Sequence, residues 1–250
     1  PTAVGRARRE RAKPRLEAVT LLSALAAVTS RVRLGVGCLA TFVHRHPVLL
    51  AQQWASLDVI SNGRSWLVAC LGGPNEQSAA QALEHAVMGI QAKERPARLA
   101  EGIVILRKLF AEKNASHHGR FYQFENVTLE PRPVQQPCPI WIASNPTGLT
   151  WKDGASATEA IVERSFRRVA RYADGWMTNK LTPEEFKSQW TRVLAMAEEE
   201  GRDSSKIGSA SSSPEASRVS FATYSRLTAA RMIAARAHTR SDSIASAEAP

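Results

Sequence analysis

Two side chains combine a suitable residue type with a suitable position for proton transfer. His44 comes after the apolar run 32–36, and Glu76 comes after the apolar run 66–71. Ligand sites of parallel α/β proteins lie at the carboxyl ends of the strands, so both side chains could face a substrate there. Glu76 is the acid nearest to its strand end and is our candidate general acid or base, with His44 as a weaker proton donor. An ordinary surface carboxylate is the alternative for Glu76.

The ends of three apolar runs could also hold a ligand through small residues and backbone groups. The segment 143–145 follows one run and could present backbone N–H groups to a phosphate, although an ordinary polar loop would have the same sequence. The segments 37–38 and 72–73 occupy the same position after two other runs, with simple glycine turns as the alternative. We therefore expect one end of the sheet to be lined by Gly37, Cys38, Gly72, Gly73, Ser144 and Asn145.

The remaining histidines and the cysteines favour structural roles. His46 precedes Pro47 and is expected to cap or pack at a helix start, and Asp174–Gly175 is expected to form a turn before a strand. The pair His117–His118 lacks the carboxylate spacing of a metal site, so we expect no bound metal. The three cysteines show no paired spacing, which predicts buried thiols and neither a disulfide framework nor a zinc site.

An α/β framework must position these residues. Short apolar runs alternate with segments of helical periodicity, as expected for parallel strands covered by helices. Four neighbouring parallel strands are predicted, in the order 32–36, 66–71, 140–143 and 176–178 around a curved sheet. Helices are expected at about 15–30, 47–62, 95–110, 160–173 and 183–201, with a surface hairpin at 118–127. Four strand-plus-helix units in a row suit a barrel or a doubly wound sheet.

Three helix ends carry clear local signals. Pro47 lies at the first position of its helix, where the missing N–H has no intrahelical partner to lose. Asn62–Gly63 is a left-handed cap signal at the end of the same helix. The tetrapeptide 182–185, Thr-Pro-Glu-Glu, is typical of a capping box with proline at the first helical position.

Length and composition predict one folded domain. The chain has 250 residues, of which 44% are hydrophobic and 22% charged, and its mean hydropathy is −0.25. This is enough chain for one sizeable core. No apolar run approaches the roughly 18–20 residues of a spanning helix, so we expect no membrane association and a cytoplasmic location. We assign residues 1–207 to the domain and residues 208–250, rich in Ala and Ser, to a weakly structured tail.

The net charge of +10 raises the question of a nucleic-acid partner. The segment 1–20 holds six basic and two acidic residues, and the charges elsewhere are mixed along helices. No basic stripe interleaved with aromatic residues accompanies this cluster. A solvated basic face is therefore expected, and a nucleic-acid partner is not.

Seven stretches resemble the luciferase-like monooxygenase family in order and spacing. They cover roughly residues 16–207 and comprise Leu25–Gly37, Arg45–Gln53, Leu57–Arg64, Glu94–Arg95 with Arg98 and Glu101, His118–Tyr122, Pro139–Ala143 and Arg168–Met177. Each stretch is a weak signal alone. Seven in sequence order make chance similarity an unlikely explanation.

The resemblance implies a (β/α)8 TIM-type barrel that binds FMN or a deazaflavin at the carboxyl ends of its strands. It implies an oxidoreductase or monooxygenase that uses reduced FMN with oxygen, or a deazaflavin hydride carrier, on a small organic substrate. It leaves open a flavin reductase and a homo-oligomer as partners. The cofactor contacts it implies are Val36, Gly37, Cys38, Cys70, Gly72, Gly73, Asn75, Ala143, Ser144 and Asn145.

The sequence departs from the family pattern at both ends. The family's first strand, helix and second strand precede the first helix seen here, and its last strands should follow Gly201, where residues 208–250 do not resemble them. We therefore expect an incomplete barrel, as a fragment or a frameshifted product would give. A truncated or degenerate non-catalytic relative is the alternative function. A nucleic-acid-binding protein rests on charge alone.

Overall fold

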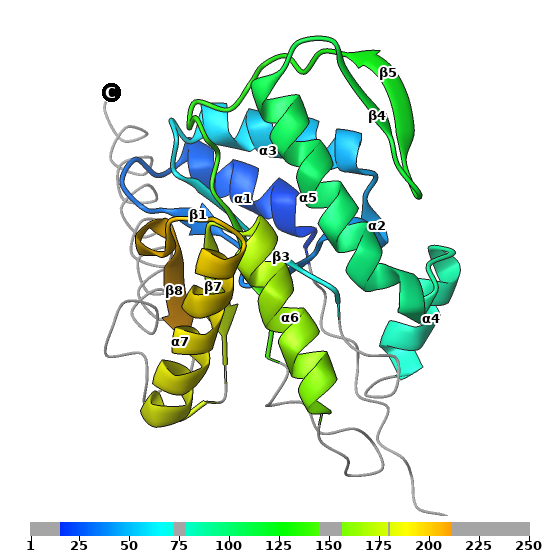
Figure 1. Cartoon of the computed structure of the whole chain (residues 1–250). Coiled ribbons are helices and arrows are strands. Elements are labelled where there is room, and N and C mark those ends of the chain that lie inside the picture. Colours follow the sequence, from blue (N-terminus) through cyan, green and yellow to red (C-terminus); the bar gives the residue numbers. More distant parts are fainter. Residues whose placement is uncertain (1–15, 73–78, 146–156, 180, 212–250) are drawn as a thin grey trace, which may run out of the picture.

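A curved parallel sheet runs through the centre of the structure, a computed structural model that describes residues 16–72, 79–145, 157–179 and 181–211 (Figure 1). The strands lie in the order β1-β3-β6-β7-β8, and β2 also pairs with β3. Their bounds are β1 Leu34–Gly35, β2 Leu39–Ala40, β3 Ser65–Cys70, β6 Ile140–Ala143, β7 Gly175–Thr178 and β8 Gly208–Ser211. All of these pairings are parallel, so the expected parallel order of the four apolar runs is confirmed.

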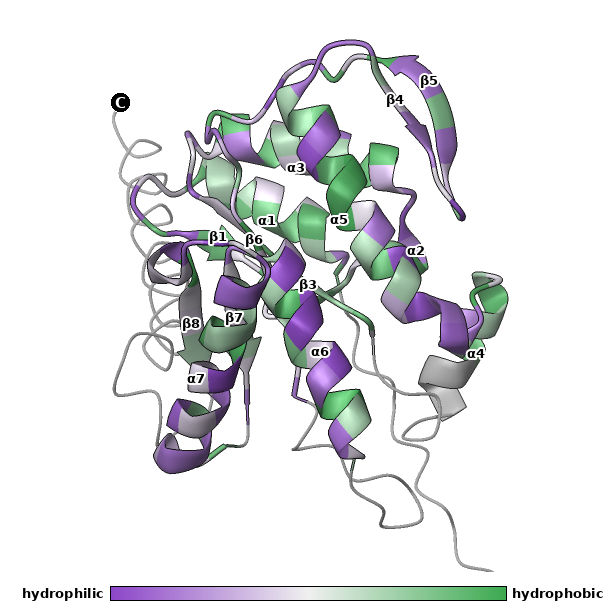
Figure 2. Ribbon diagram, in the orientation of Figure 1, coloured by the Kyte–Doolittle hydropathy of each residue, from purple (hydrophilic) through white to green (hydrophobic). Residues whose placement is uncertain are grey.

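Helices cover the convex side of this sheet (Figure 1). Their bounds are α1 Ala18–Ala27, α2 Thr41–His44, α3 Pro47–Ile60, α4 Ala79–Val87, α5 Arg95–Ala111, α6 Glu159–Tyr172 and α7 Pro183–Glu199, with short 3-10 turns at Ala92–Glu94 and Ser204–Lys206. Figure 2 shows hydrophilic residues along the outward side of α6 and hydrophobic residues prominent on α1 and α3. Within the described residues, no helix combines the length and apolar character needed to cross a membrane.

The predicted helix ends are confirmed by their hydrogen bonds. His46 caps α3, because its Nδ1 accepts a hydrogen bond from the backbone N–H of Val48 at 3.3 Å. At α7 the Thr182 hydroxyl accepts from the N–H of Glu185, and the Glu185 carboxylate accepts from the N–H of Thr182. These caps satisfy N–H groups that lack partners within the helix.

The core lies between the sheet and the helix pair α3 and α5. Trp54 on α3 and Ile103 and Leu106 on α5 are fully or almost fully buried. Asp58 is also fully buried, and its carboxylate accepts hydrogen bonds from Ser65 Oγ at 2.6 Å and from the backbone N–H and side-chain amide of Gln135. A buried carboxylate is tolerated because these donors replace its hydration. It ties α3 to β3 and to the loop that leads into β6.

Side chains alternate between the two faces of the sheet and explain its curvature. Trp176 on β7 points toward the helical layer, where its ring stacks on that of Phe186 with the ring centroids 5.6 Å apart. Trp141 on β6 points to the concave side, where a Cβ on Gly175 would lie 2.2 Å and a Cβ on Gly208 2.6 Å from its ring atoms. Glycine at both positions lets β7 and β8 fold in against this indole.

The hairpin predicted at 118–127 is confirmed as the antiparallel pair β4 (Ala115–His118) and β5 (Gln123–Val127). It extends from one end of the helical layer (Figure 1). Glu101 on α5 accepts hydrogen bonds from the backbone N–H groups of Phe121 and Tyr122 at 3.1 and 3.0 Å. This one carboxylate therefore connects the hairpin to the helix.

Three expectations need correction. The strand expected at 32–36 is short, and a second short strand, β2, follows it. The strand β8 occupies the first four residues of the expected weakly structured tail, because small residues fit against Trp141 where an apolar run would not. The rest of that tail, 212–250, lies outside the described residues, so the division into domain and tail stays a prediction. Buried thiols were expected throughout, yet Cys38 is exposed and Cys70 is half-buried, because both lie at strand ends.

Candidate functional site

The carboxyl ends of the strands meet at one edge of the curved sheet. Parallel pairing places the ends of β2, β3, β6 and β7 at this edge, which we call the carboxyl edge. Of the residues expected to line it, Gly37 and Cys38 lie between β1 and β2, Gly72 follows β3, and Ser144 and Asn145 follow β6. Three separate segments thus contribute to one edge.

The thiols of Cys38 and Cys70 face each other at this edge. Ala40 pairs with Cys70 in the parallel register of β2 and β3, and Cys38 lies just before β2, so the register brings Cys38 alongside the end of β3. The hydrogen bond from the Cys70 thiol holds the pKa of Cys38 below its usual value, and the same bond together with burial raises the pKa of Cys70 well above its usual range. Cys38 is therefore the more readily ionised thiol of the pair.

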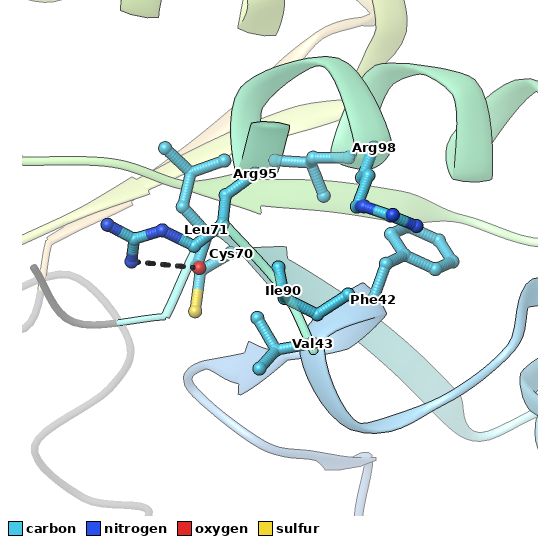
Figure 3. A pocket seen from close by; sticks show the side chains of 8 residues that line it. Phe42, Val43, Cys70, Leu71, Ile90, Arg95 and Arg98 are labelled. Carbon is cyan, nitrogen blue, oxygen red and sulfur yellow. Dashed lines mark hydrogen bonds between the residues drawn. The ribbon is translucent and has the colours of Figure 1, made fainter. Parts of the chain in front are cut away.

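Thr41 and Arg95 hold the end of β3 in place. The buried Thr41 hydroxyl donates to the carbonyl of Leu39 at 2.7 Å and accepts from the backbone N–H of Cys70 at 3.3 Å. The Arg95 guanidinium donates to the carbonyls of Leu71 and Gly72 at 3.5 and 3.4 Å, the first of which is drawn in Figure 3. The backbone at 70–72 is thus held by a hydroxyl group on one segment and a guanidinium group on another.

A small, mostly apolar pocket lies beside this end of β3 (Figure 3). It is lined by Phe42, Val43, Cys70, Leu71, Ile90, Arg95, Arg98 and Leu99. The Cys70 sulfur and the Arg95 guanidinium contribute its polar groups on the side of the carboxyl edge. The pocket is too narrow for a flat ring system and belongs to the packing behind the edge.

His85 lies next to Gly72, and His44 and Glu84 lie near His85. His44 Nε2 is 2.9 Å from Glu84 Oε1, and the two side chains are 29% and 47% exposed. His85 is almost fully buried, and a Cβ on Gly72 would lie 3.3 Å from its Nε2. Burial lowers the pKa of His85, and the nearby Arg95 charge lowers it further. The edge therefore combines a shielded His44 Nε2, paired with the more exposed Glu84 carboxylate, with a neutral imidazole.

The turns after β6 and β7 form a second polar group. Trp176 Nε1 donates to the carbonyl and hydroxyl oxygens of Ser144 at 3.1 and 3.0 Å. Asn145 Nδ2 donates to Asn179 Oδ1 at 2.6 Å, and Thr178 Oγ1 donates to Asn145 Oδ1 at 3.3 Å. The Ser144 backbone N–H donates to the carbonyl of Met177, so it is already paired. The two turns are therefore held together by their own hydrogen bonds.

An open strip of backbone lies on the concave side of the edge. Gly37 and Cys38 are exposed, and the peptide bond between them is cis. A Cβ on Gly37 would lie 3.1 Å from the sulfur of Met177, which is on β7, across the concave side. Glycine at this position lets the Met177 side chain lie close to the backbone. A planar group can lie against this backbone, as the flat ring of a flavin would need.

Of the two predicted proton-transfer residues, His44 lies within the described residues and Glu76 does not. His44 lies at the carboxyl edge, where it pairs with Glu84, a residue that the sequence patterns did not single out. Glu76, Gly73 and Asn75 lie outside the described residues, so their roles stay predictions. His85 was also not predicted, because α4 carries no strong local signal for a site. Its closeness to Gly72 depends on contacts between distant segments.

The other predicted cofactor contacts lie along the same edge. Val36 is half-buried between β1 and β2, Cys70 ends β3, and Ala143 ends β6. Of the residues expected to be structural, Asp174 accepts hydrogen bonds from the backbone N–H of Ile140 and from Arg107, both at 2.8 Å, at the opposite end of the sheet. Among the described residues, no group of three or more His, Cys, Asp and Glu side chains could hold a metal ion.

A curled parallel sheet with an outer helical layer places the chain in the TIM-barrel class of folds, of which it forms about half a barrel. A sequence model of the luciferase-like monooxygenase family matches residues 4–150. The chain belongs to this family. The resemblance seen in the sequence is thereby confirmed.

Named relatives and solved structures agree with this assignment. The F420-dependent glucose-6-phosphate dehydrogenase of Kineococcus radiotolerans is 32% identical over 136 residues, which are 53% of this chain and 38% of that protein. Monooxygenase RslO1 from Streptomyces bottropensis has 30% sequence identity and a TM-score of 0.58, over 75% of this chain and 51% of its own.

A third comparison shows the fold alone. An F420-dependent secondary alcohol dehydrogenase in complex with an F420-acetone adduct superposes with a TM-score of 0.63 at 18% identity, over 78% of this chain and 53% of its own. The chain therefore spans between about two-fifths and about half of the length of these three proteins.

Proposed function

We propose that the protein containing this chain is an oxidoreductase that binds FMN or a deazaflavin at the carboxyl edge and acts on a small organic substrate. The observation that carries the proposal is the exposed backbone of Gly37 and Cys38 at the carboxyl edge, where Gly37 has no side chain of its own to keep a flat ring away. Family membership and the F420-dependent relative support it. Both a monooxygenase and a deazaflavin-dependent dehydrogenase fit this reading.

At such a site the cofactor and the protein have separate roles. The bound ring supplies the electron or hydride chemistry, and the protein supplies orientation, polarity and exclusion of water. Backbone at 36–38 and 70–72 would hold the ring, and the turn at 144–145 would lie toward its phosphate-bearing side. His44 Nε2 and Glu84 Oε1, 2.9 Å apart, can share a proton, which the 47% exposed Glu84 side chain can exchange with solvent.

The test uses a longer, chimeric chain. It is made by joining this chain to the barrel segments that precede and follow the matched region in the Kineococcus relative. FMN and coenzyme F420 are titrated separately, and quenching of cofactor fluorescence is followed. We expect one of them to bind, and Gly37→Val to weaken that binding at least about tenfold, because the new side chain would crowd Met177 and shift the backbone on which the ring lies.

Ala195→Val is the matched control, since it adds the same kind of side chain at an exposed position on α7. It should leave the affinity unchanged. Equal binding by the Gly37→Val variant would place the cofactor elsewhere. Failure of the folded longer chain to bind either cofactor would favour the non-catalytic relative.

A further inference from the structure

The two thiols at the carboxyl edge have no role in the proposed chemistry. Cys38 is exposed, whereas Cys70 is half-buried at the end of β3. They come from segments more than thirty positions apart in the sequence, yet the β2–β3 pairing brings the start of β2, which Cys38 directly precedes, beside the end of β3. Their thiols are joined by a hydrogen bond.

We propose that Cys38 and Cys70 form a peroxide-sensitive pair, which closes to an intramolecular disulfide between the residue before β2 and the end of β3 when the chain meets a hydroperoxide. Two thiols in contact at an exposed strand end meet the needs of such a pair, namely access for the oxidant and a second sulfur within reach. The proposal concerns the chain's own thiols and does not depend on the proposed function.

The two sulfurs have different parts in the reaction. The Cys38 thiolate attacks one oxygen of the peroxide, the O–O bond breaks, and the departing hydroxide takes a proton to become water, leaving a sulfenic acid on Cys38. The Cys70 sulfur then attacks the Cys38 sulfur, the S–O bond breaks, and the Cys70 proton leaves with the hydroxyl group as water. Two thiols are oxidised by two electrons, and one peroxide is reduced to two waters.

The pKa shifts of the three cysteine thiols favour this order of reaction. The pKa of Cys38 lies below its usual value, so a larger fraction of it is the reactive thiolate near neutral pH. The raised pKa of Cys70 keeps it a thiol until its partner has been oxidised. Burial, with the nearby Asp58 carboxylate, raises the pKa of Cys138 to about 12, and Cys138 is buried. Cys138 is therefore a built-in unreactive control.

Peptide mapping tests the proposal directly, because trypsin leaves the three cysteines on three peptides, 34–45, 65–93 and 121–152. The 250-residue chain is treated with a slight excess of hydrogen peroxide, blocked with N-ethylmaleimide under denaturing conditions, and digested without reductant. We expect a cross-linked species of 34–45 and 65–93, about 2 Da lighter than the two free peptides together, which dithiothreitol separates. Peptide 121–152 should carry the maleimide.

Two variants sharpen the result. Cys138→Ser should keep the cross-link, whereas Cys70→Ser should abolish it and leave Cys38 as a sulfenic acid that dimedone traps. In the native untreated chain, Cys38 should react with iodoacetamide at least about tenfold faster than Cys138.

Three outcomes would overturn the proposal. One is maleimide on both 34–45 and 65–93 after peroxide treatment of the wild-type chain. Another is oxidation of Cys138 as fast as that of Cys38. The third is a cross-link between two copies of Cys38, seen as a dimer on a non-reducing gel. All three are read from the unmodified sequence, so they stand even if a variant fails to fold.

Discussion

His85 illustrates how the environment sets the chemistry of a single residue. It is 1% exposed, on the helix α4, and its imidazole lies beside Gly72 at the carboxyl edge. The charged groups facing it are Arg95, Glu84 and His44, of which Arg95 and His44 oppose its protonation and Glu84 favours it. Burial is the largest influence, so the imidazole is neutral near neutral pH.

The lowered pKa of His85 predicts a loss of stability in mild acid. The unfolded chain takes up this proton near the ordinary pKa of 6.5, before the folded chain does, so stability present above pH 6.5 is lost as the pH falls through the folded pKa. The free energy of unfolding, measured with urea, should therefore fall from pH 7 to pH 5. His85→Gln should make this fall smaller.

His118→Gln is the control for that measurement, because the His118 side chain is 68% exposed. It should leave the slope unchanged. A residual slope in the His85→Gln variant is expected from His46, whose pKa is also lowered by burial. Identical slopes in wild type and His85→Gln would show that His85 does not titrate differently in the folded chain.

At the scale of elements, the packing of α2 on α5 decides the shape of the edge. Phe42 on α2 is buried against Gly102 on α5, where a Cβ would lie 2.5 Å from atoms of its ring. α2 directly follows β2 and carries His44 at its end. The close approach at Gly102 therefore sets how near α2, and with it His44, lies to the middle of α5.

Gly102→Ala should destabilise the chain although alanine is the better helix former. The gain in helix propensity is about 1 kcal/mol, whereas overpacking a filled core typically costs about 1–3 kcal/mol. Because the neighbour is a buried ring with little freedom to move, we expect a net loss of about 1 kcal/mol in the free energy of urea unfolding.

A double variant checks the cause of that loss. In a Phe42→Leu background the ring is gone, so adding Gly102→Ala should cost less than it does in the wild type, and the two changes should be non-additive. A stabilising effect of Gly102→Ala alone would mean that α2 moves aside freely. In that case the contact would not position His44.

At the scale of the whole molecule, the described strands form an open curved sheet. The concave side carries Trp66 and Trp141, whose rings meet edge to face with centroids 4.8 Å apart, and both remain only partly buried. In a closed barrel this side is filled by layers of side chains from all the strands. A cofactor bound at the carboxyl edge would accordingly be enclosed by the described strands on only part of its surface.

We predict that the 250-residue chain binds FMN or coenzyme F420 at least about tenfold more weakly than the longer chain described above, because contact area and preorganisation are both lost. Fluorescence titration of the two chains under identical conditions measures the difference. Circular dichroism of both establishes that each is folded. Equal and tight binding by the shorter chain would show that the strands described here suffice for the site.

Local patterns in the sequence determined the elements and much of their order. The capping box at Thr182 and the His46–Pro47 helix start depend on residues within one turn of each other, and continuous apolar runs marked the strands that helices bury. The expected parallel order followed, since buried strands linked by helices have few other arrangements. The places of Gly37, Gly72 and Ser144 at one edge then followed from topology alone.

Only the tertiary structure decided which side chains meet. The Cys38–Cys70 contact depends on the register of β2 against β3, and the His44–Glu84 pair depends on how α4 packs, so neither leaves a periodic or spacing signal in the sequence. The strand β8 was missed for the same reason, because its small residues carry no apolar pattern and their place in the sheet is set by pairing with β7. Contacts between distant segments are set by packing, which the sequence encodes through the whole chain and not through any local pattern.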